Sequence, residues 1–414
     1  MIKKINIIYF FFYLTVLLGV IFNEDLLGGS KHDYLFHLKF INLFKEDLFN
    51  GIKNFGYNEY ATRNSPIFYI ILAFLNNFIS LESIRFINSL ASITISLLFY
   101  KTLKLKFSYV DKDKLKILFC IFFISPTVRS LSIWPYPIIW SYIFFLFSIY
   151  HFLLFEKNSK IKNNYYCFLN LIIASYLNYT FSFFGVFYLI KFIKKNKNPF
   201  SLIKLIFFLL IFLLPAIFFL FFRDGLYVFG LPDGFSLSLY QTLNFSNKVA
   251  VISTIFFLYL IPFLNFQKIR FEFKNLTTHN YFIFLILIFL TILFFEYPFT
   301  NSFGGGVFFK LSHILFNNNY FFYIIFIISF FVIFILYRDL ESLQIVFILF
   351  FLYNLQFTIY MKYYDPLVFL IIFFLLNKKI PNIFFRDNYF LYKIYLFQII
   401  TYVIFILRNQ LSII

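Results

Sequence analysis

Long apolar runs alternate with short polar stretches along the whole chain. Many of these runs approach the ~20 residues that a helix needs to cross ~30 Å of hydrocarbon. They lack the period-two alternation of barrel strands, and otherwise only helices satisfy their backbone in lipid. The predicted spans are 5–22, 84–103, 115–128, 136–155, 164–178, 180–193, 202–222, 248–265, 280–296, 320–337, 343–360, 366–377 and 389–407. The pattern predicts an all-α polytopic membrane bundle of about 12–13 transmembrane helices.

The position of a shorter apolar run, 67–79, relative to the membrane is predicted from the distribution of lysines and not from hydropathy. Cytoplasmic loops are enriched in Lys and Arg. If this run crossed the membrane, the lysine cluster at 101–116 would lie outside while Lys3 and Lys4 lie inside. An interfacial helix at 67–79 returns that cluster to the cytoplasm. The same choice makes further basic loops cytoplasmic, namely 157–162, 191–204, 268–274 and 378–393.

Composition agrees with this topology. Hydrophobic residues make up 62% of the chain, against roughly 45–50% in a soluble domain. Of the 36 Lys and Arg residues, 24 fall on the cytoplasmic side and 12 on the other. That bias explains the net charge of +18 better than nucleic-acid binding does, so no nucleic-acid partner is expected. Cys120 and Cys167 lie in apolar runs and are expected to be buried packing residues.

The first non-cytoplasmic loop, 23–83, is the longest polar part of the predicted topology. The remaining outer segments are shorter, chiefly 223–247 and 297–319. No internal repeat is apparent, so residues 1–414 are predicted to form one transmembrane domain. A long loop among tight connections is usually functional, and this loop is therefore the first place to look for chemistry.

Asp33 and His37 are the candidate catalytic pair in that loop. Their spacing of four places both on one face of a helix, where an imidazole can orient a carboxylate or shift its pKa. A general base or an electrostatic stabiliser at the membrane surface is the functional interpretation, and a solvated polar loop is the alternative. His32 adds a possible ligand, but no spacing is specific for a metal. Ser65 and Pro66 suit the start of an apolar helix.

Two basic residues, Arg129 and Lys362, lie at the predicted outer ends of helices. Cations at that depth are costly unless they are paired or wetted, and both residue types bind phosphate well. Snorkelling of the long side chain to the interface is the alternative. The run Gly304 to Gly306 lacks a following Gly-Lys-Ser/Thr, so a nucleotide-binding P-loop is not indicated and a flexible turn is expected.

The order of these features resembles the GT-C superfamily of polytopic glycosyltransferases, which use polyprenyl-phosphate sugars. The similarity lies in a first helix, an outer loop with an early acid in residues 32–37 (HDYLFH), a Pro-containing juxtamembrane helix at 64–72 (NSPIFYIIL), and a span opening at 84–89 (IRFINS). It covers about the first 200 residues and a C-terminal patch at 362–366 (KYYDP). The dolichyl-phosphate-glucose glucosyltransferases look nearest in pattern.

This resemblance implies roles for individual residues. The first-loop acid of such enzymes acts as base or stabiliser toward the acceptor, which would assign that role to Asp33. Lys362, with Tyr363, would contact the donor phosphate, and Arg129 is a further candidate for that contact. Glu59 and Arg63, in the polar cluster that ends the loop, are assigned to the acceptor side.

The implied activity is a hexosyltransferase reaction in cell-envelope polysaccharide biosynthesis. The enzyme would move a sugar from the polyprenyl phosphate to a glycan, lipid-linked or protein acceptor on the non-cytoplasmic face. The expected location is a bacterial inner (plasma) membrane, with contacts to membrane lipid and a cytoplasmic N-terminus. No cofactor is expected, and dependence on a divalent metal is open. An O-antigen or exopolysaccharide polymerase and a lipid-oligosaccharide flippase or transporter are the alternatives.

Overall fold

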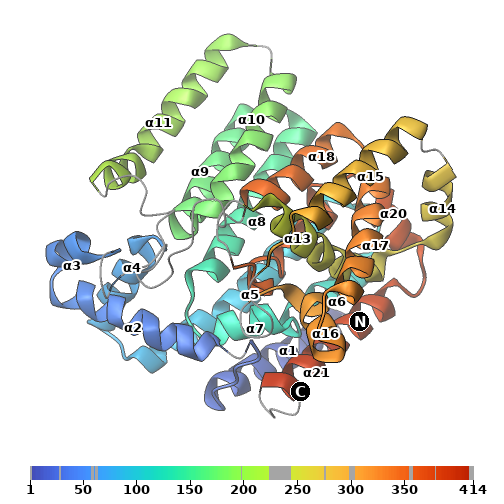
Figure 1. The fold of residues 1–414 in the computed structure, drawn as a ribbon. Coiled ribbons are helices and arrows are strands. Elements are labelled where there is room, and N and C mark those ends of the chain that lie inside the picture. Colours follow the sequence, from blue (N-terminus) through green and yellow to red (C-terminus); the bar gives the residue numbers. More distant parts are fainter. Residues whose placement is uncertain are drawn as a thin grey trace. The chain divides into compact units, whose positions relative to one another are not determined.

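The computed structural model describes residues 2–27, 29–56, 60, 64–196, 198–222, 244–274, 277–297, 304–353, 358–377 and 379–409. Within these ranges the regular secondary structure is entirely helical (Figure 1). The predicted all-α fold class is therefore confirmed.

Five of the described helices are long and apolar enough to cross a membrane. They are Leu81–Lys106, Pro137–Asn158, Pro199–Phe219, Phe245–Phe263 and Phe390–Leu407. A sixth candidate is the pair Lys112–Phe123 and Pro126–Ile133, whose two parts meet at 60°. Four other predicted spans form apolar helices of 10–17 residues, which are Ile7–Ile21, Thr278–Leu293, Tyr320–Leu336 and Leu340–Leu352. The chain is thus an integral membrane protein with several membrane-spanning helices.

The chain folds into two compact units. Unit 1 is Met1–Ser236 with Ile394–Ile414, and unit 2 is Leu237–Lys393. The elements of unit 1 are α1 (Ile2–Ile21), α2 (Ser30–Glu46), α3 (Leu48–Asn54), α4 (Pro66–Asn76), α5 (Leu81–Lys106), α6 (Lys112–Phe119), η2 (Cys120–Phe123), α7 (Pro126–Ile133), α8 (Pro137–Asn158), α9 (Ile161–Leu177), η3 (Tyr179–Phe183), α10 (Phe184–Lys195), α11 (Pro199–Phe222) and most of α21 (Phe390–Asn409). In its interior, α8 packs along α5 and α9, and α1 packs on α5 and α7.

A break interrupts the apolar run that the sequence assigned to one helix at 115–128. The Ser125 side chain caps α7 by accepting a hydrogen bond from the Val128 amide, and Pro126 follows at the first helical position. Proline at this position fixes φ at a helical value. Its lack of an N–H group loses no helical hydrogen bond, because the first amides of a helix have no carbonyl partner within the helix. The break starts a new helix, α7, and sets Arg129 in its first turns.

The predicted outer loop, 23–83, contains three helices, α2, α3 and α4. Their shared core contains Phe40, Phe55 and Tyr69, each fully buried, with the Tyr69 ring centroid 4.9 Å from Phe40 and 5.7 Å from Phe55. The 11 residues of α4 span only ~16 Å at 1.5 Å per residue. That is about half the hydrocarbon thickness, so α4 alone is too short to cross. Its placement at the interface remains a prediction.

Unit 2 is arranged around α13 (Phe245–Leu260), which packs against several helices that follow it in sequence. The other elements are η4 (Ile261–Phe263), α14 (Phe266–Lys274), α15 (Thr278–Leu293), α16 (Gly306–Phe316), α17 (Tyr320–Leu336), α18 (Leu340–Phe347), the π-helix η5 (Ile348–Leu352), η6 (Met361–Tyr363), α19 (Leu367–Phe374) and α20 (Lys379–Arg386). The described contacts of α13 include α15, α16, α17 and η5.

The glycine run before α16 is an ordered turn of unit 2. Gly304, Gly305 and Gly306 have φ values of +68°, +82° and +75°, a region that glycine enters freely. The Gly305 amide donates to the Ile359 carbonyl at 3.0 Å. A Cβ on Gly304 would collide with the Tyr297 hydroxyl, so this position requires glycine for space as well as for φ.

The two cysteines behave as the sequence predicted. Cys120 and Cys167 are both buried free thiols. Cys167 lies within hydrogen-bonding distance of the Ser148 hydroxyl, at 3.4 Å, between α8 and α9. Both therefore serve as packing residues.

Candidate functional site

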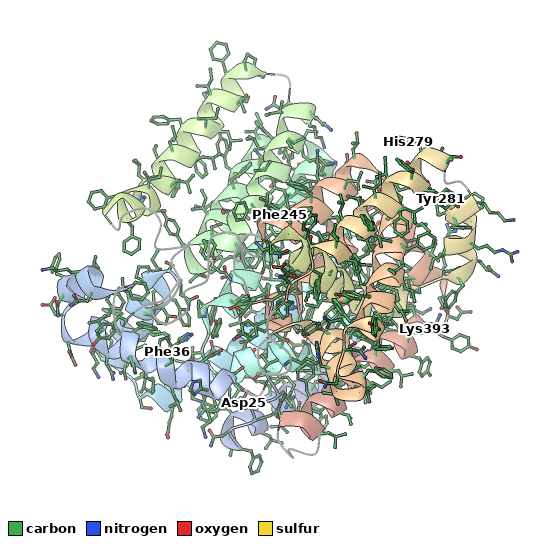
Figure 2. The ribbon with its side chains drawn as sticks, in the orientation of Figure 1. Asp25, Phe36, Phe245, His279, Tyr281 and Lys393 are labelled. Atoms are coloured by element: carbon green, nitrogen blue, oxygen red, sulfur yellow. The ribbon has the colours of Figure 1, made fainter. Side chains whose placement is uncertain are left out.

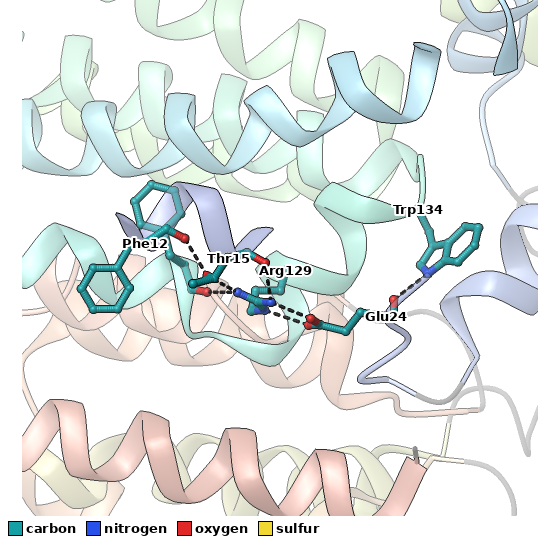
Figure 3. Close-up of polar contacts among 6 residues, drawn as sticks. Phe12, Thr15, Glu24, Arg129 and Trp134 are labelled. Atoms are coloured by element: carbon teal, nitrogen blue, oxygen red, sulfur yellow. Dashed lines mark hydrogen bonds and ion pairs between the residues drawn. The ribbon is translucent and has the colours of Figure 1, made fainter. Parts of the chain in front are cut away.

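A buried ion pair joins α7 to the residues that follow α1. The guanidinium of Arg129, which is 4% exposed, donates from Nε to Glu24 Oε1 at 2.8 Å and from Nη2 to Glu24 Oε2 at 2.6 Å (Figure 3). This two-pronged geometry is the strong form of an Arg–carboxylate contact. The two residues are 105 positions apart in sequence.

The remaining donors of Arg129 are also taken by protein atoms. Nη1 donates to Thr15 Oγ1 at 2.8 Å and to the Phe123 carbonyl at 3.1 Å, and Nη2 donates to the Thr15 carbonyl at 3.1 Å. With the two bonds to Glu24, these contacts match the five N–H groups of a guanidinium. Arg129 therefore ties α1, η2 and α7 together and keeps no donor for an incoming phosphate.

Trp134 extends this network beyond Glu24. Its Nε1 donates to the Glu24 carbonyl at 2.9 Å. The Arg85 guanidinium of α5 lies over the Trp134 ring, 3.9 Å from the centroid, and Arg85 also donates to the Val20 carbonyl at 3.2 Å. An Arg stacked on an indole is a favourable cation–π contact. The end of α1 is thereby held from both α5 and α7.

Asp25, which lies outside the helix, accepts hydrogen bonds from backbone amides at the N-terminus of α2. The residue at the N-cap position, Gly29, has no side chain to do so. The carboxylate of Asp25 instead accepts hydrogen bonds from the amides of Ser30 and Lys31, both at 3.1 Å. The Ser130 hydroxyl donates to Asp25 at 3.4 Å and lies within hydrogen-bonding distance of the Ser30 hydroxyl, at 3.0 Å. An anion at a helix N-terminus is favoured by the helix dipole, and here it also docks α2 on α7.

Asp33 and His37 both lie on α2, as their spacing predicted, and α2 begins just after Asp25 (Figure 2). His37 is buried, with its ring centroid 4.9 Å from Tyr136 and 5.2 Å from Tyr69 of α4. Asp33 is partly exposed in the first turn of α2. The carboxylate thus lies at the edge of the buried helix face, while the imidazole is packed inside.

Tyr34, next to Asp33, points toward the Arg85 and Trp134 pair. Its ring centroid is 5.7 Å from that of Trp134. Burial raises the pKa of the Tyr34 phenol above its ordinary value, and the positive charge of Arg85 opposes that rise. The Tyr34 hydroxyl is therefore neutral near pH 7 and carries a proton it can donate.

The predicted phosphate-binding residues Lys362 and Tyr363 belong to unit 2, in η6. The Lys362 Nζ lies 5.4 Å from the ring centroid of Tyr360 and 5.9 Å from that of Tyr363. Both side chains are partly exposed. Asp365 follows, buried, before α19. Lys362 is thus a cation on an aromatic platform with some access to its surroundings.

Two other predicted residues, Glu59 and Arg63, lie outside the described residues. In the described part of the chain no three His, Cys, Asp or Glu residues gather as metal ligands would. The sequence singled out Arg129 as a candidate phosphate contact but gave no partner for it. The available signal was the cost of a buried cation, which demands an acid nearby without saying which one.

Comparison of the chain with protein-family models, with curated proteins and with solved structures finds no match.

Proposed function

We propose that the protein is a membrane glycosyltransferase that moves a sugar from a polyprenyl-phosphate carrier to an acceptor on the non-cytoplasmic face. The observation that carries this proposal is the fold of the first outer segment. There Asp25 and Ser130 fix α2 against α7, and α2 presents Asp33 at the edge of its buried face. The short apolar helix α4 packs beside α2, as suits a surface along which a lipid carrier approaches.

In this proposal the transfer needs orientation and charge stabilisation more than covalent help from the protein. The bond between the anomeric carbon and the phosphate oxygen breaks, and its electron pair leaves with the phosphate. The acceptor hydroxyl oxygen forms the new bond to the same carbon. Asp33 takes the hydroxyl proton, and His37 positions the helix face that carries Asp33.

The donor phosphate is assigned to Lys362 with Tyr363. Lys362 is partly exposed, whereas every donor of Arg129 is engaged by Glu24, Thr15 and Phe123. Arg129 then supports the site by holding Glu24 and α7. The setting that fits these roles is a bacterial plasma membrane with the N-terminus in the cytoplasm, and the acceptor is a glycan, a lipid-linked sugar or a protein.

The test is sugar transfer from radiolabelled polyprenyl-phosphate glucose in proteoliposomes. We expect Asp33→Asn to lower the transfer rate by about 10²-fold or more, the usual contribution of a general base. Glu46→Gln removes an exposed acid at the other end of α2 and should leave the rate unchanged. Full activity of folded Asp33→Asn would overturn the assignment. A ladder of products in place of one added sugar would identify a polymerase instead.

A further inference from the structure

Lys248 is a buried cation that the proposed function leaves unused. It is the fourth residue of α13, which begins at Phe245 (labelled in Figure 2), and is 2% exposed. Its Nζ is buried and, among the described residues, makes no hydrogen bond. Among the described residues its Nζ lies near one aromatic ring, 5.9 Å from the Phe245 centroid.

An ammonium removed from water without a partner is strongly unfavourable, and proteins normally pair buried charges. Arg129, the other Lys or Arg that is buried among the described residues, follows that rule through Glu24. Lys248 does not. Its surroundings therefore suit a negative group that none of the described residues supplies.

The start of α13 adds to this preference. Asn244 caps the helix by accepting a hydrogen bond from the Asn247 amide at 3.1 Å. The Asn247 side chain is fixed in turn, because it donates to the Glu296 carbonyl at 2.9 Å and accepts from the Glu296 amide at 2.8 Å. Lys248 thus projects from a rigid helix start whose dipole is itself positive. A lysine at that position is disfavoured unless an anion is present.

We infer that Lys248, at the start of α13, binds a phosphate group. An ammonium binds phosphate as a point charge, and a helix N-terminus favours the same ligand. The phosphate belongs either to the headgroup of a lipid or to a soluble anion. This inference goes beyond the proposed function, because it requires binding only and no transfer reaction.

The experiment measures binding to the purified full-length chain in detergent, by thermal unfolding and by titration. Three probes separate the ligand sources: farnesyl phosphate, farnesol as the same chain without charge, and inorganic phosphate. Lys248→Met removes the charge but keeps an unbranched side chain, and Lys248→Arg keeps the charge. The matched control is Lys393→Met, because Lys393 is exposed and already paired with Asp387.

We expect Lys248→Met to weaken farnesyl phosphate binding by about tenfold or more, the size of one charged hydrogen bond. Lys248→Arg should bind within several-fold of the unaltered protein, and Lys393→Met should bind equally well. Without ligand, Lys248→Met should unfold at a higher temperature, since an uncompensated buried charge is gone. Tighter binding of farnesyl phosphate than of inorganic phosphate identifies a lipid, and equal binding identifies a soluble anion.

Three outcomes overturn the inference: equal phosphate binding by Lys248→Met, binding of farnesol as tight as that of farnesyl phosphate, or no phosphate binding by the unaltered protein. If Lys248→Met does not fold, Lys248→Gln takes its place under the same criteria. The result is separable from the proposed function. If Lys248→Met still transfers sugar and binds phosphate as tightly as the unaltered protein, only the phosphate site is rejected. If Lys248→Met loses phosphate binding but the unaltered protein transfers no sugar, only the glycosyltransferase is rejected.

Discussion

At the residue scale, Arg129 and Glu24 form the contact on which α1, η2 and α7 converge. Arg129 is almost fully enclosed, so its charge is tolerated only while Glu24 and Thr15 accept its hydrogen bonds. Removing one partner from such a pair leaves an uncompensated charge inside the protein, which costs more than the pair itself contributes.

We predict that Glu24→Ala lowers the free energy of unfolding by about 3–5 kcal/mol. The double variant Glu24→Ala with Arg129→Met should recover much of that loss, because neither charge remains. Asp113→Ala is the matched control: it breaks the partly exposed ion pair with Lys116, and such pairs contribute under about 1 kcal/mol. Denaturation in detergent measures all three. Losses of equal size in Glu24→Ala and Asp113→Ala would contradict a buried role for Glu24.

At the element scale, helix starts in this chain are fixed by specific side chains that sequence reasoning recognised only in part. The Ser-Pro signals before α4 and α7 are local, and the first was read correctly as a helix start. The second lies inside the single span predicted at 115–128, because hydropathy carries no information about a bend in a helix. The cap of α2 was not predicted, because the capping side chain belongs to Asp25, which lies before the turn that precedes the helix. The N-cap position itself is occupied by Gly29.

The start of α18 gives a prediction about pH. Asp339 accepts hydrogen bonds from the Ser342 amide at 2.9 Å and from Asn377 Nδ2 at 2.9 Å. Burial alone would raise the pKa of Asp339, but these hydrogen bonds outweigh it and hold the pKa below its ordinary value. A lowered folded-state pKa stabilises the fold above the unfolded pKa of about 3.9, and this contribution is lost as pH falls through the folded value.

We therefore expect the unaltered protein to lose stability relative to Asp339→Asn as pH falls from about 5 to below 3. Asparagine caps helices well but does not titrate, so the two proteins should differ mainly in this pH dependence. Thermal unfolding across that range, taken as the difference between the two proteins, is the measurement. Parallel curves would show that the Asp339 carboxylate does not contribute through its charge.

At the scale of the whole molecule, the membrane class followed from run length and composition, because these are local and additive along the chain. The site did not follow in the same way. Asp33 and His37 were placed together by helical spacing, which is short-range. The contact of Arg129 with Glu24 depends on how α1 and α7 pack, and a sequence carries no direct sign of it.

The sidedness of the chain is the last prediction, and it depends on α4. If α4 lies at the interface, Lys53 before it and Asn77 after it face the same side, opposite to Ser108 after α5. All three are exposed, and the native Cys120 and Cys167 are buried, so single cysteines introduced there can be labelled selectively. With an impermeant maleimide on intact cells, we expect Lys53→Cys and Asn77→Cys to react and Ser108→Cys to react only after permeabilisation.

A crossing α4 would instead put Lys53→Cys and Asn77→Cys on opposite sides. Asp33 would then share a side with the lysine cluster at 101–116, and Lys3 and Lys4 would lie on the side opposite that cluster, so the positive-inside rule could not hold for both groups of lysines.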